Sequence, residues 1–327
     1  MKHILVFGSG SWGSALTIHL AQSHHVYLYV RDNNSYQKML ESRCNEKYLP
    51  GIPFPEKLKV IDNWLEVIKS CQYILISTPS IAFENTLKSI APYIHQQKLI
   101  SATKGFCHSS YKLLDQIACE YLPDTPYALI TGPSFAKEVA SNLPTAVVAA
   151  SSDLNYAKEV QHLFNHRAFR CYSSDDITGA EVGGAVKNAL AIACGISDGL
   201  GFGANARAGL ITRGLKEMIR LGLSLGAKVE TFSGLSGLGD LVLTCTDNQS
   251  RNRRFGLLVG QGKTQKEATD TVQQVVEGIA TTKAIYHLAQ KQHIDMPIVE
   301  VIYQVLHENY PAKKAVEKLL SRTLKSE

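Results

Sequence analysis

Hydrophobic and polar positions in the first half of the chain alternate between short apolar runs and segments long enough for helices. The apolar runs are rich in β-branched and aromatic residues and end at polar, Gly or Pro residues, which predicts buried strands. We expect these strands at His3–Phe7, Val26–Val30, Tyr73–Ser77, Leu99–Ala102, Ala128–Thr131 and Ala146–Ala149. Because helix-length segments separate them, the pattern predicts parallel βαβ units with helices on both faces of one sheet.

The pattern changes after residue 173. From Ile177 to the C-terminus the apolar positions follow helical spacing interrupted by Gly-rich turns, and no strand is predicted. Ser173–Asp176 supply several possible N-caps, so we expect a long helix to follow them. The expected fold class is therefore α/β, with an N-terminal Rossmann-type doubly wound parallel sheet in residues 1–173 and an all-helical C-terminal domain in residues 174–327.

The composition is that of a globular protein. Hydrophobic residues make up 45% and charged residues 19% of the chain, which excludes disordered and collagen-like proteins. The net charge of +5 is small for 327 residues and does not indicate nucleic acid, although it suits an anionic small substrate.

Cysteine use and the N-terminus bear on the compartment. The seven cysteines include no Cys-x-x-Cys pair, so we expect reduced packing thiols and no metal site. Residues Met1–Gly8 lack the apolar region of a signal peptide, and no later stretch reaches the ~20 apolar residues of a spanning helix. We expect a cytoplasmic protein without membrane insertion.

A glycine-rich loop follows the first predicted strand. The run Gly8-Ser9-Gly10-Ser11-Trp12-Gly13 matches the pattern Gly-x-Gly-x-x-Gly and opens a predicted helix. In this context Gly8 permits a tight turn, Gly10 lets a pyrophosphate approach bare backbone, and Gly13 lets the helix pack on the strand. The helix N-terminus attracts the phosphates. The loop therefore predicts that residues 1–173 bind a dinucleotide.

The end of the second predicted strand bears on the choice of dinucleotide. Arg31 stands where NAD-specific sites often carry an acidic residue, and Asp32 follows it. An arginine can pair with the 2′-phosphate of NADP, whereas Asp32 can hold a ribose hydroxyl. The choice stays open, as does an exposed loop arginine without a ligand, but we expect NADPH to be preferred and NADH to be accepted.

Two further segments follow predicted strands of the sheet. Lys104 comes after Leu99–Ala102, and Gly132-Pro133-Ser134 comes after Ala128–Thr131. Ligands of doubly wound sheets bind at the carboxyl ends of the strands, so these residues are candidates to face a substrate. For either segment alone, a plain loop is an equal alternative.

Lys187 stands in the middle of a predicted helix, beside Gly183 and Gly184. Glycine inside a helix costs about 1 kcal/mol relative to alanine. The cost is easier to understand if something flat, such as a nicotinamide ring or a neighbouring domain, approaches the backbone there. A partly desolvated lysine can give a proton to a carbonyl oxygen and take it back. A packed surface lysine is the alternative.

Asp240 and a basic segment complete the candidates. Three arginines stand within four residues in Asn248–Arg254, interleaved with Ser and Asn, and predict a phosphate site. Nucleic acid is disfavoured because aromatic residues are not interleaved there. His162 and His166 lack the Glu of a metalloprotease motif, so they are expected at the surface.

Five segments carry a closer resemblance. They are Gly-Ser-Gly-Ser-Trp-Gly (8–13), Ser-Ala-Thr-Lys-Gly (101–105), Thr-Gly-Pro-Ser-Phe-Ala-Lys-Glu-Val (131–139), the run from Glu181 to Gly214, and the run from Leu238 to Gly256. Together they resemble the NAD(P)-dependent glycerol-3-phosphate dehydrogenase family of bacterial type over nearly the whole chain. The last two are highly specific, because generic dinucleotide-binding folds share only the first motif.

The resemblance implies reduction of dihydroxyacetone phosphate to sn-glycerol 3-phosphate by NADPH or NADH, a step that supplies phospholipid synthesis. It makes Lys187 the catalytic proton donor and acceptor at the C2 oxygen. It assigns substrate binding to Lys104, Gly132, Ser134, Lys187, Asp240, Ser250, Arg251 and Asn252. It assigns cofactor binding to Gly8, Gly10, Ser11, Trp12, Gly13, Arg31, Lys104, Ala136, Arg251, Val275 and Glu277.

Two other functions share parts of this pattern. One is a dehydrogenase of the same two-domain layout that acts on a hydroxy acid or an acyl-CoA. The other is a nucleotide-sensing protein without turnover, whose sign would be loss of Lys187 or Asp240, and both are present. We also expect no nucleic-acid partner and, because the helical domain has many apolar stripes, a homodimer.

Overall fold

The computed structural model describes residues 1–321, and their packing divides the chain into two compact units. Unit 1 comprises residues 1–107 and 112–180. Unit 2 comprises residues 108–111 and the chain from Glu181 onward. The chain therefore passes from unit 1 to unit 2, returns for one long segment, and passes to unit 2 again.

Unit 1 is built on one eight-stranded sheet with the order β3-β2-β1-β4-β5-β6-β7-β8. Its strands are β1 (His3–Phe7), β2 (His25–Tyr29), β3 (Leu58–Ile61), β4 (Tyr73–Ile76), β5 (Lys98–Ser101), β6 (Tyr127–Thr131), β7 (Thr145–Ala150) and β8 (Phe169–Ser174). Strands β1 to β6 pair in parallel, but β7 is antiparallel to β6 and parallel to β8. The expected sheet is confirmed, with the correction that it is not parallel throughout.

The six predicted strands are present with shifts of a residue or so at their ends, while β3 and β8 were not predicted. Both of these strands lie at edges of the sheet. In β8, Phe169 and Cys171 are buried while Arg170 and Tyr172 are exposed, and β3 alternates in the same way. Edge strands keep one face in water, so they lack the continuous apolar run that marks a central parallel strand.

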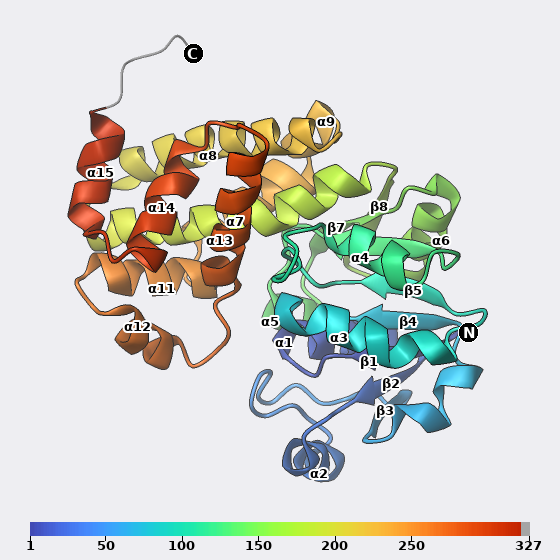
Figure 1. Ribbon diagram of the computed structural model, residues 1–327. Helices are drawn as coiled ribbons and strands as arrows, with labels where there is room; N and C mark the ends of the chain where they lie inside the picture. The colour runs from blue at the N-terminus through green and yellow to red at the C-terminus, as the bar shows by residue number, and fades with distance from the viewer. Residues whose placement is uncertain (322–327) are drawn as a thin grey trace. The chain divides into compact units, whose positions relative to one another are not determined.

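Helices cover both faces of the sheet (Figure 1). Successive residues of β1 point to opposite faces, so Val6 packs in one core with side chains of α1 and α6, and Leu5 packs in the other with side chains of α3 and α4. The helices of unit 1 are α1 (Ser11–Leu20), α2 (Asn33–Ser42), α3 (Ser80–Ile90), α4 (Leu114–Tyr121), α5 (Ala136–Ala140) and α6 (Leu154–Phe164), with short turns η1 (Trp64–Glu66), η2 (Ile68–Ser70) and η3 (Ala91–Tyr93).

From Ile177 to residue 321 every regular element is helical, as the sequence predicts. The elements are α7 (Ile177–Gly199), α8 (Ala204–Ser224), α9 (Val229–Ser233), the π-helical turn η4 (Leu235–Gly239), α10 (Asp240–Thr246), α11 (Arg251–Gly260), α12 (Gln265–Val272), α13 (Glu277–Lys291), α14 (Pro297–His307) and α15 (Ala312–Leu320).

Helix α7 is the buried axis of unit 2. Every residue from Glu181 to Ser197 is buried, as in a helix that other helices enclose on all sides. Asp176 caps its start, because the Asp176 carboxylate accepts a hydrogen bond of 2.9 Å from the Gly179 N–H. This confirms the expected cap and the long helix after it.

None of the seven cysteines, all of which lie within residues 1–321, forms a disulfide. Six are buried as expected, whereas Cys119 on α4 is exposed and is not a packing residue. Within residues 1–321, no helix combines the length and the apolar character that crossing a membrane requires.

Candidate active site

The glycine loop between β1 and α1 has the geometry that its three glycines predict. Gly8 has φ of +113°, and a Cβ atom there would lie 2.5 Å from the Ser77 carbonyl oxygen. A Cβ atom on Gly13 would lie 1.8 Å from the Gly8 carbonyl oxygen, whereas one on Gly10 would meet no atom within 4 Å. The first and third positions therefore exclude side chains, and the second leaves bare backbone open to a ligand.

Polar groups around this loop fit a dinucleotide. Gly10 is the N-cap of α1 and no side chain caps the helix, so its first N–H groups can receive an anion. Trp12 Nε1 and the hydroxyls of Ser77 and Thr78 are buried without a hydrogen-bond partner among residues 1–321. A buried polar atom without a partner is costly, and a bound pyrophosphate or ribose would satisfy such atoms.

Arg31 and Asp32 are both exposed at the end of β2, but only one of them has a local partner. The Asp32 carboxylate caps α2 by accepting a 2.8 Å hydrogen bond from the Ser35 N–H. Hydrogen bonds from the side chain and backbone of Ser35 lower the pKa of Asp32. Arg31 makes no hydrogen bond or ion pair with other described residues, so its guanidinium is available to a ligand.

The structure brings Lys104, Gly132 and Ser134 together at the carboxyl ends of β5 and β6. The Gly132 carbonyl oxygen accepts hydrogen bonds from Lys104 Nζ at 3.3 Å and from Ser134 Oγ at 2.9 Å. Gly132 has φ of +131°, which a glycine adopts without strain. Nearby in sequence, Ala136 opens α5 and packs with Trp12 against the same apolar core.

Lys187 of α7 and Asp240 of α10 form a buried ion pair between Lys187 Nζ and Asp240 Oδ1. Their side chains are only 7% and 1% exposed. Thr244, one turn after Asp240, donates from Oγ1 to the Asp240 carbonyl oxygen at 2.6 Å and lies 3.4 Å from Oδ1. A buried carboxylate held in this way fixes the position of the ammonium group.

Gly183, about one turn before Lys187 on α7, is needed for a reason that differs from the one expected from the sequence. A Cβ atom on Gly183 would lie 2.2 Å from the Ser236 carbonyl oxygen. Ser236 belongs to η4, the turn that leads directly into Asp240. The expectation of a nicotinamide ring or a neighbouring domain at Gly183 is therefore wrong, because backbone of unit 2 itself occupies this place and sets Asp240 against Lys187.

The first turn of α11 is tied to α7 and α13 through Asn252. Its Nδ2 donates to Asn188 Oδ1 at 3.0 Å, and its Oδ1 accepts from the Gly278 N–H at 2.9 Å. Ser250 caps α11, with its Oγ accepting from the Arg253 N–H at 3.2 Å. The amide of Asn252 and the hydroxyl of Ser250 thus hold the backbone that carries the half-buried Arg251.

The three arginines of this segment do not act as one cluster. Arg253 is buried, and its guanidinium binds Asp198 Oδ2 at 2.5 Å and Asn248 Oδ1. The expectation that all three arginines form one anion site is therefore wrong for Arg253, because its guanidinium is paired with the Asp198 carboxylate within unit 2.

At the start of α13, Glu277 is the first helical residue, Val276 is buried and Val275 is 53% exposed. The buried apolar positions of this segment therefore begin at Val276, and Val275 is open to solvent. His162 is exposed as expected, whereas His166 is half-buried between α6 and β8.

Sequence reasoning missed Asn188 and Thr244. Thr244 stands four residues after Asp240 on a helix, a spacing that places two side chains on one face. Asn188 is a polar residue followed by the apolar run 189–194 of α7, which signals a buried hydrogen bond. Cys245, the residue after Thr244, is a buried thiol whose pKa is raised by burial and by Cys194.

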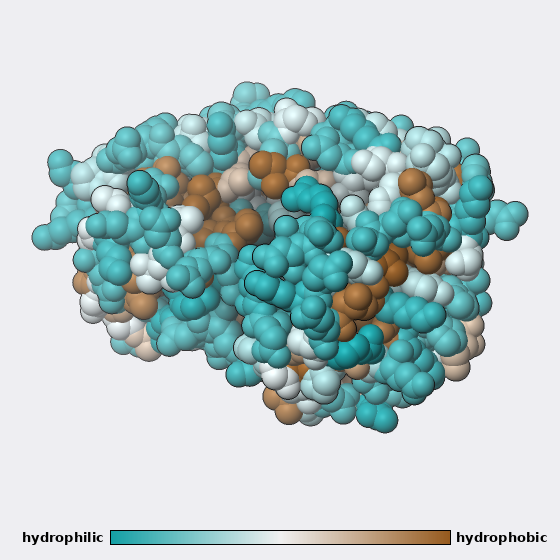
Figure 2. All heavy atoms as spheres, turned by 90° about the horizontal axis from the view of Figure 1, so that it is seen from below, coloured by the Kyte–Doolittle hydropathy of each residue, from teal (hydrophilic) through white to brown (hydrophobic). Residues whose placement is uncertain are grey.

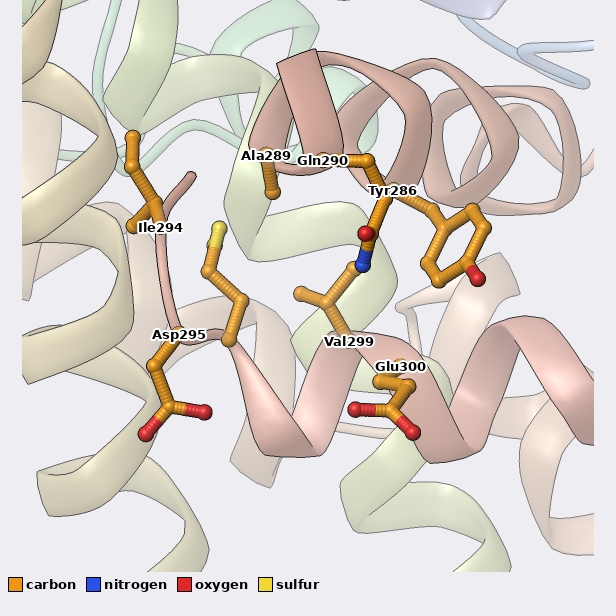
Figure 3. A pocket seen from close by; sticks show the side chains of 8 residues that line it. Tyr286, Ala289, Gln290, Ile294, Asp295, Val299 and Glu300 are labelled. Carbon is orange, nitrogen blue, oxygen red and sulfur yellow. The ribbon is translucent and has the colours of Figure 1, made fainter. Parts of the chain in front are cut away.

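A small pocket in unit 2, whose lining side chains Figure 3 shows, is lined by none of these residues. It has a volume of about 100 Å³, below the roughly 300 Å³ of the smallest usual ligand pockets. Its wall carries the carboxylates of Asp295 and Glu300, and Glu300 is paired with Lys318 at 2.8 Å. Carboxylate oxygens in the wall accept hydrogen bonds and do not donate them, which disfavours a phosphate.

Known proteins resemble the chain over its full length. The family model for the NAD-dependent glycerol-3-phosphate dehydrogenase N-terminus matches residues 3–157, and the model for the C-terminus of the same family matches residues 176–317. A glycerol-3-phosphate dehydrogenase (NAD(P)+) of Francisella tularensis subsp. novicida is 54% identical, covering 100% of this chain and 99% of the relative.

Solved structures agree with the sequence comparisons. Glycerol-3-phosphate dehydrogenase from Coxiella burnetii superimposes with a TM-score of 0.95 at 44% identity, covering 98% of this chain and 99% of that one. The yeast enzyme of the same name gives a TM-score of 0.83 at 26% identity, covering 97% and 98%. The chain therefore belongs to the NAD-dependent glycerol-3-phosphate dehydrogenase family.

Proposed function

We propose that this protein is an NAD(P)-dependent glycerol-3-phosphate dehydrogenase that interconverts dihydroxyacetone phosphate and sn-glycerol 3-phosphate. The full-length identity to relatives of that name supports the reaction. The observation that carries the chemistry is the buried ion pair of Lys187 and Asp240. A lysine that a buried carboxylate holds in one position suits a proton donor, which a nucleotide sensor without turnover does not need.

The cofactor site belongs to unit 1 and uses the glycine loop. Its unpartnered polar groups and the open backbone at Gly10 fit NAD or NADP. When bound, the nicotinamide supplies or accepts the hydride. The residues proposed to hold the cofactor are Gly8, Gly10, Ser11, Trp12, Gly13, Arg31, Lys104 and Ala136, with Arg251, Val275 and Glu277 from unit 2.

Lys187 is the acid and base of the reaction. Its Nζ gives a proton to the C2 oxygen when the ketone is reduced and takes it back when the alcohol is oxidised. The developing negative charge on that oxygen is stabilised by the ammonium group in a site with little water. Asp240 and Thr244 keep Nζ in one position, so that no reorganisation is needed during the reaction.

The phosphate of the substrate is bound at the start of α11. Arg251 and the helix N-terminus both favour an anion there, and Ser250 and Asn252 fix the backbone. Lys104, Gly132 and Ser134 are the proposed substrate residues of unit 1. Binding energy from the phosphate, which does not react, then orients the carbonyl group.

NADPH is the preferred cofactor in this proposal. Asp32 uses one carboxylate oxygen to cap α2, whereas the Arg31 guanidinium makes no hydrogen bond or ion pair among the described residues that would compete with a phosphate. Arg31 is exposed and can offer its fork of donors to a 2′-phosphate. NADH lacks that phosphate but makes the remaining contacts, so it is also accepted.

We propose that the protein is cytoplasmic and forms a homodimer. Its product would supply glycerol phosphate for phospholipid synthesis. The free thiols suit a reducing compartment. Figure 2 shows patches of apolar residues on a mostly hydrophilic face, and unit 2 exposes Phe202, Leu223, Val229, Leu238 and Val242. Exposed apolar patches often mark protein interfaces. Light scattering of the purified protein measures its oligomeric state, and the mass of a monomer would contradict the proposed dimer.

The proposed reaction is tested by following NADPH absorbance with dihydroxyacetone phosphate and identifying the product. We expect NADPH oxidation in step with formation of sn-glycerol 3-phosphate. Parallel reactions with a hydroxy-acid precursor such as pyruvate and with an acyl-CoA serve as controls. Turnover of either control with no turnover of dihydroxyacetone phosphate would overturn the proposal.

A further inference from the structure

The backbones of α7 and α11 approach each other closely at glycines of both helices. A Cβ atom on Gly195 of α7 would lie 2.1 Å from the Arg253 carbonyl oxygen, and one on Gly256 of α11 would lie 2.2 Å from the Ile192 carbonyl oxygen. Close backbone approach of this kind gives tight packing. Glycines, however, have no side chains that interlock, so the sliding and rotation of one helix on the other depend on side-chain contacts beside them, such as the hydrogen bond of 3.0 Å between Asn252 Nδ2 and Asn188 Oδ1.

A charged group bridges the same two helices beside this contact. Asp198, the penultimate residue of α7, binds Arg253 of α11 through Oδ2 at 2.5 Å. The same carboxylate binds Arg207 of α8, whose Nη1 lies 2.9 Å from Oδ1 and 2.8 Å from Oδ2. The side chains of Asp198 and Arg253 are each only 10% exposed, so solvent screens this pair weakly.

The position of Asp198 is unfavourable without these partners. The C-terminus of a helix carries partial negative charge and favours cations, and a nearly buried carboxylate needs compensating charge. Two guanidinium groups supply that charge. The second one, Arg253, stands in the first turn of α11, next to Arg251 and Asn252.

We infer that Asp198 is a positioning residue for substrate binding: by holding Arg253 it fixes the first turn of α11 against α7, and so fixes Arg251 relative to Lys187. This inference rests on the proposed function. It also explains why Arg253 takes no part in binding the phosphate, although it lies in the basic segment. Arg207 balances the charge of Asp198, and its hydrogen bonds run to that carboxylate.

Steady-state kinetics of the full-length protein tests this inference with Asp198→Asn and the matched control Arg207→Gln. Asp198→Asn keeps the shape of the side chain but weakens its hold on Arg253. We expect its KM for dihydroxyacetone phosphate to rise at least tenfold while kcat changes less than threefold. Arg207→Gln leaves the contact to α11 in place, so its KM is expected to stay within threefold of wild type.

Amide hydrogen exchange gives a second readout that does not depend on activity. Asp198→Asn is expected to speed exchange in residues 250–254 at least tenfold and to leave residues 183–190 of α7 unchanged. Lack of turnover by the wild type would contradict the proposed reaction, while faster exchange at 250–254 would still support the positioning role.

Two results would overturn the inference. One is that the Asp198→Asn variant exchanges the amides of residues 250–254 at the same rate as the wild type. The other is an equal rise in KM for Asp198→Asn and Arg207→Gln, which would mean a general loss of stability. If Asp198→Asn does not fold, Arg253→Lys replaces it, because lysine keeps the charge but cannot bind Asp198 and Asn248 together. The same rise in KM is expected, and an unchanged KM would refute the role.

Discussion

At the scale of single residues, Lys187 and Asp240 depend on each other. Both side chains are almost fully buried, and a buried charge is tolerated only when it is paired. The pairing keeps a flexible lysine in one position, which a proton donor needs. The same pairing makes the lysine costly to remove, so catalytic and structural effects must be measured separately.

Replacing Lys187 with Met is expected to lower kcat by a factor of about 10² to 10⁴, the usual contribution of positioned acid-base catalysis. NADPH affinity, measured by fluorescence titration, is expected to stay close to that of the wild type. The unpaired Asp240 will also lower stability by roughly 3–5 kcal/mol. The double variant Lys187→Met with Asp240→Asn removes that charge and is expected to recover part of the stability without recovering activity. A kcat within a few-fold of wild type would remove Lys187 from the mechanism.

Replacing Arg31 with Ala is expected to weaken NADPH binding by roughly 1–3 kcal/mol, the value of a charge-assisted hydrogen bond. NADH binding is expected to be nearly unchanged, since NADH has no 2′-phosphate. Titrating both cofactors against both proteins checks this expectation. Equal losses for the two cofactors would mean that Arg31 supports the loop or contacts the adenine, and the preference for NADPH would then be withdrawn.

The roles of some residues were predictable from the sequence because they depend on neighbouring residues in the chain. The helical position of Lys187 and the geometry of the glycine loop follow from neighbours in the chain. The partner of Arg253 does not, because Asp198 stands 55 residues away in sequence. A cluster of arginines shows where positive charge is, but the fold decides which of the arginines already has a counter-ion.

At the scale of elements, α7 organises the candidate site of unit 2. Glycines let three other segments approach its backbone. Gly183 and Gly195 of α7 make room for η4 and α11. At the start of α13 the glycine is on the other helix, because a Cβ atom on Gly278 would lie 2.7 Å from the Asn188 carbonyl oxygen. These segments lead to Asp240, Arg251 and Glu277. The glycines inside the helix are therefore kept for packing, which offsets their low helix propensity.

Replacing Gly195 with Ala is expected to destabilise the protein by about 1–3 kcal/mol, because the methyl group overpacks against the backbone of α11. Gly209 of α8 is the matched control, since a Cβ atom there meets nothing within 4 Å. Gly209→Ala is expected to stabilise the protein by about 0.5–1 kcal/mol through helix propensity. Chemical denaturation measures both changes. A stable Gly195→Ala variant would argue against close packing of α7 and α11.

Elements with continuous apolar runs were predictable, and elements at the sheet edges were not. β4 is buried at every residue and stands out in the sequence, whereas β8 shows only an alternation that short loops can share. The antiparallel direction of β7 was also not predictable, because strand direction depends on how the chain returns to the sheet and not on the strand's own residues.

At the scale of the whole molecule, stability depends on buried groups far from the candidate site. His19 on α1 is buried, and its Nε2 lies 2.7 Å from the Phe164 carbonyl oxygen. Burial lowers the pKa of His19 to about 4. Burial also raises the pKa of Glu217 on α8 to about 7, so the two groups oppose each other as pH changes.

Acid is expected to destabilise the protein through His19. Its folded pKa lies below the unfolded value, so its contribution to stability is complete above about pH 6.5 and is lost as pH falls toward 4. The total loss of stability from His19 is roughly 3 kcal/mol.

Glu217 acts in the opposite sense, because its contribution to stability is lost as pH rises from about 4.5 to 7. Denaturation of wild type and His19→Gln at pH 7 and pH 5 isolates the histidine: the variant is expected to lose less stability than the wild type, and an equal loss would contradict the role of His19.

The proposed reaction depends on the substrate's phosphate, with proton transfer by Lys187 and phosphate binding by Arg251. The most direct test compares kcat/KM for dihydroxyacetone phosphate with kcat/KM for dihydroxyacetone, using NADPH. Charge-assisted hydrogen bonds to the phosphate contribute about 1.5–3 kcal/mol each, so losing several is expected to lower kcat/KM at least about a hundredfold. Equal values for the two ketones would contradict the phosphate site and the function proposed from it.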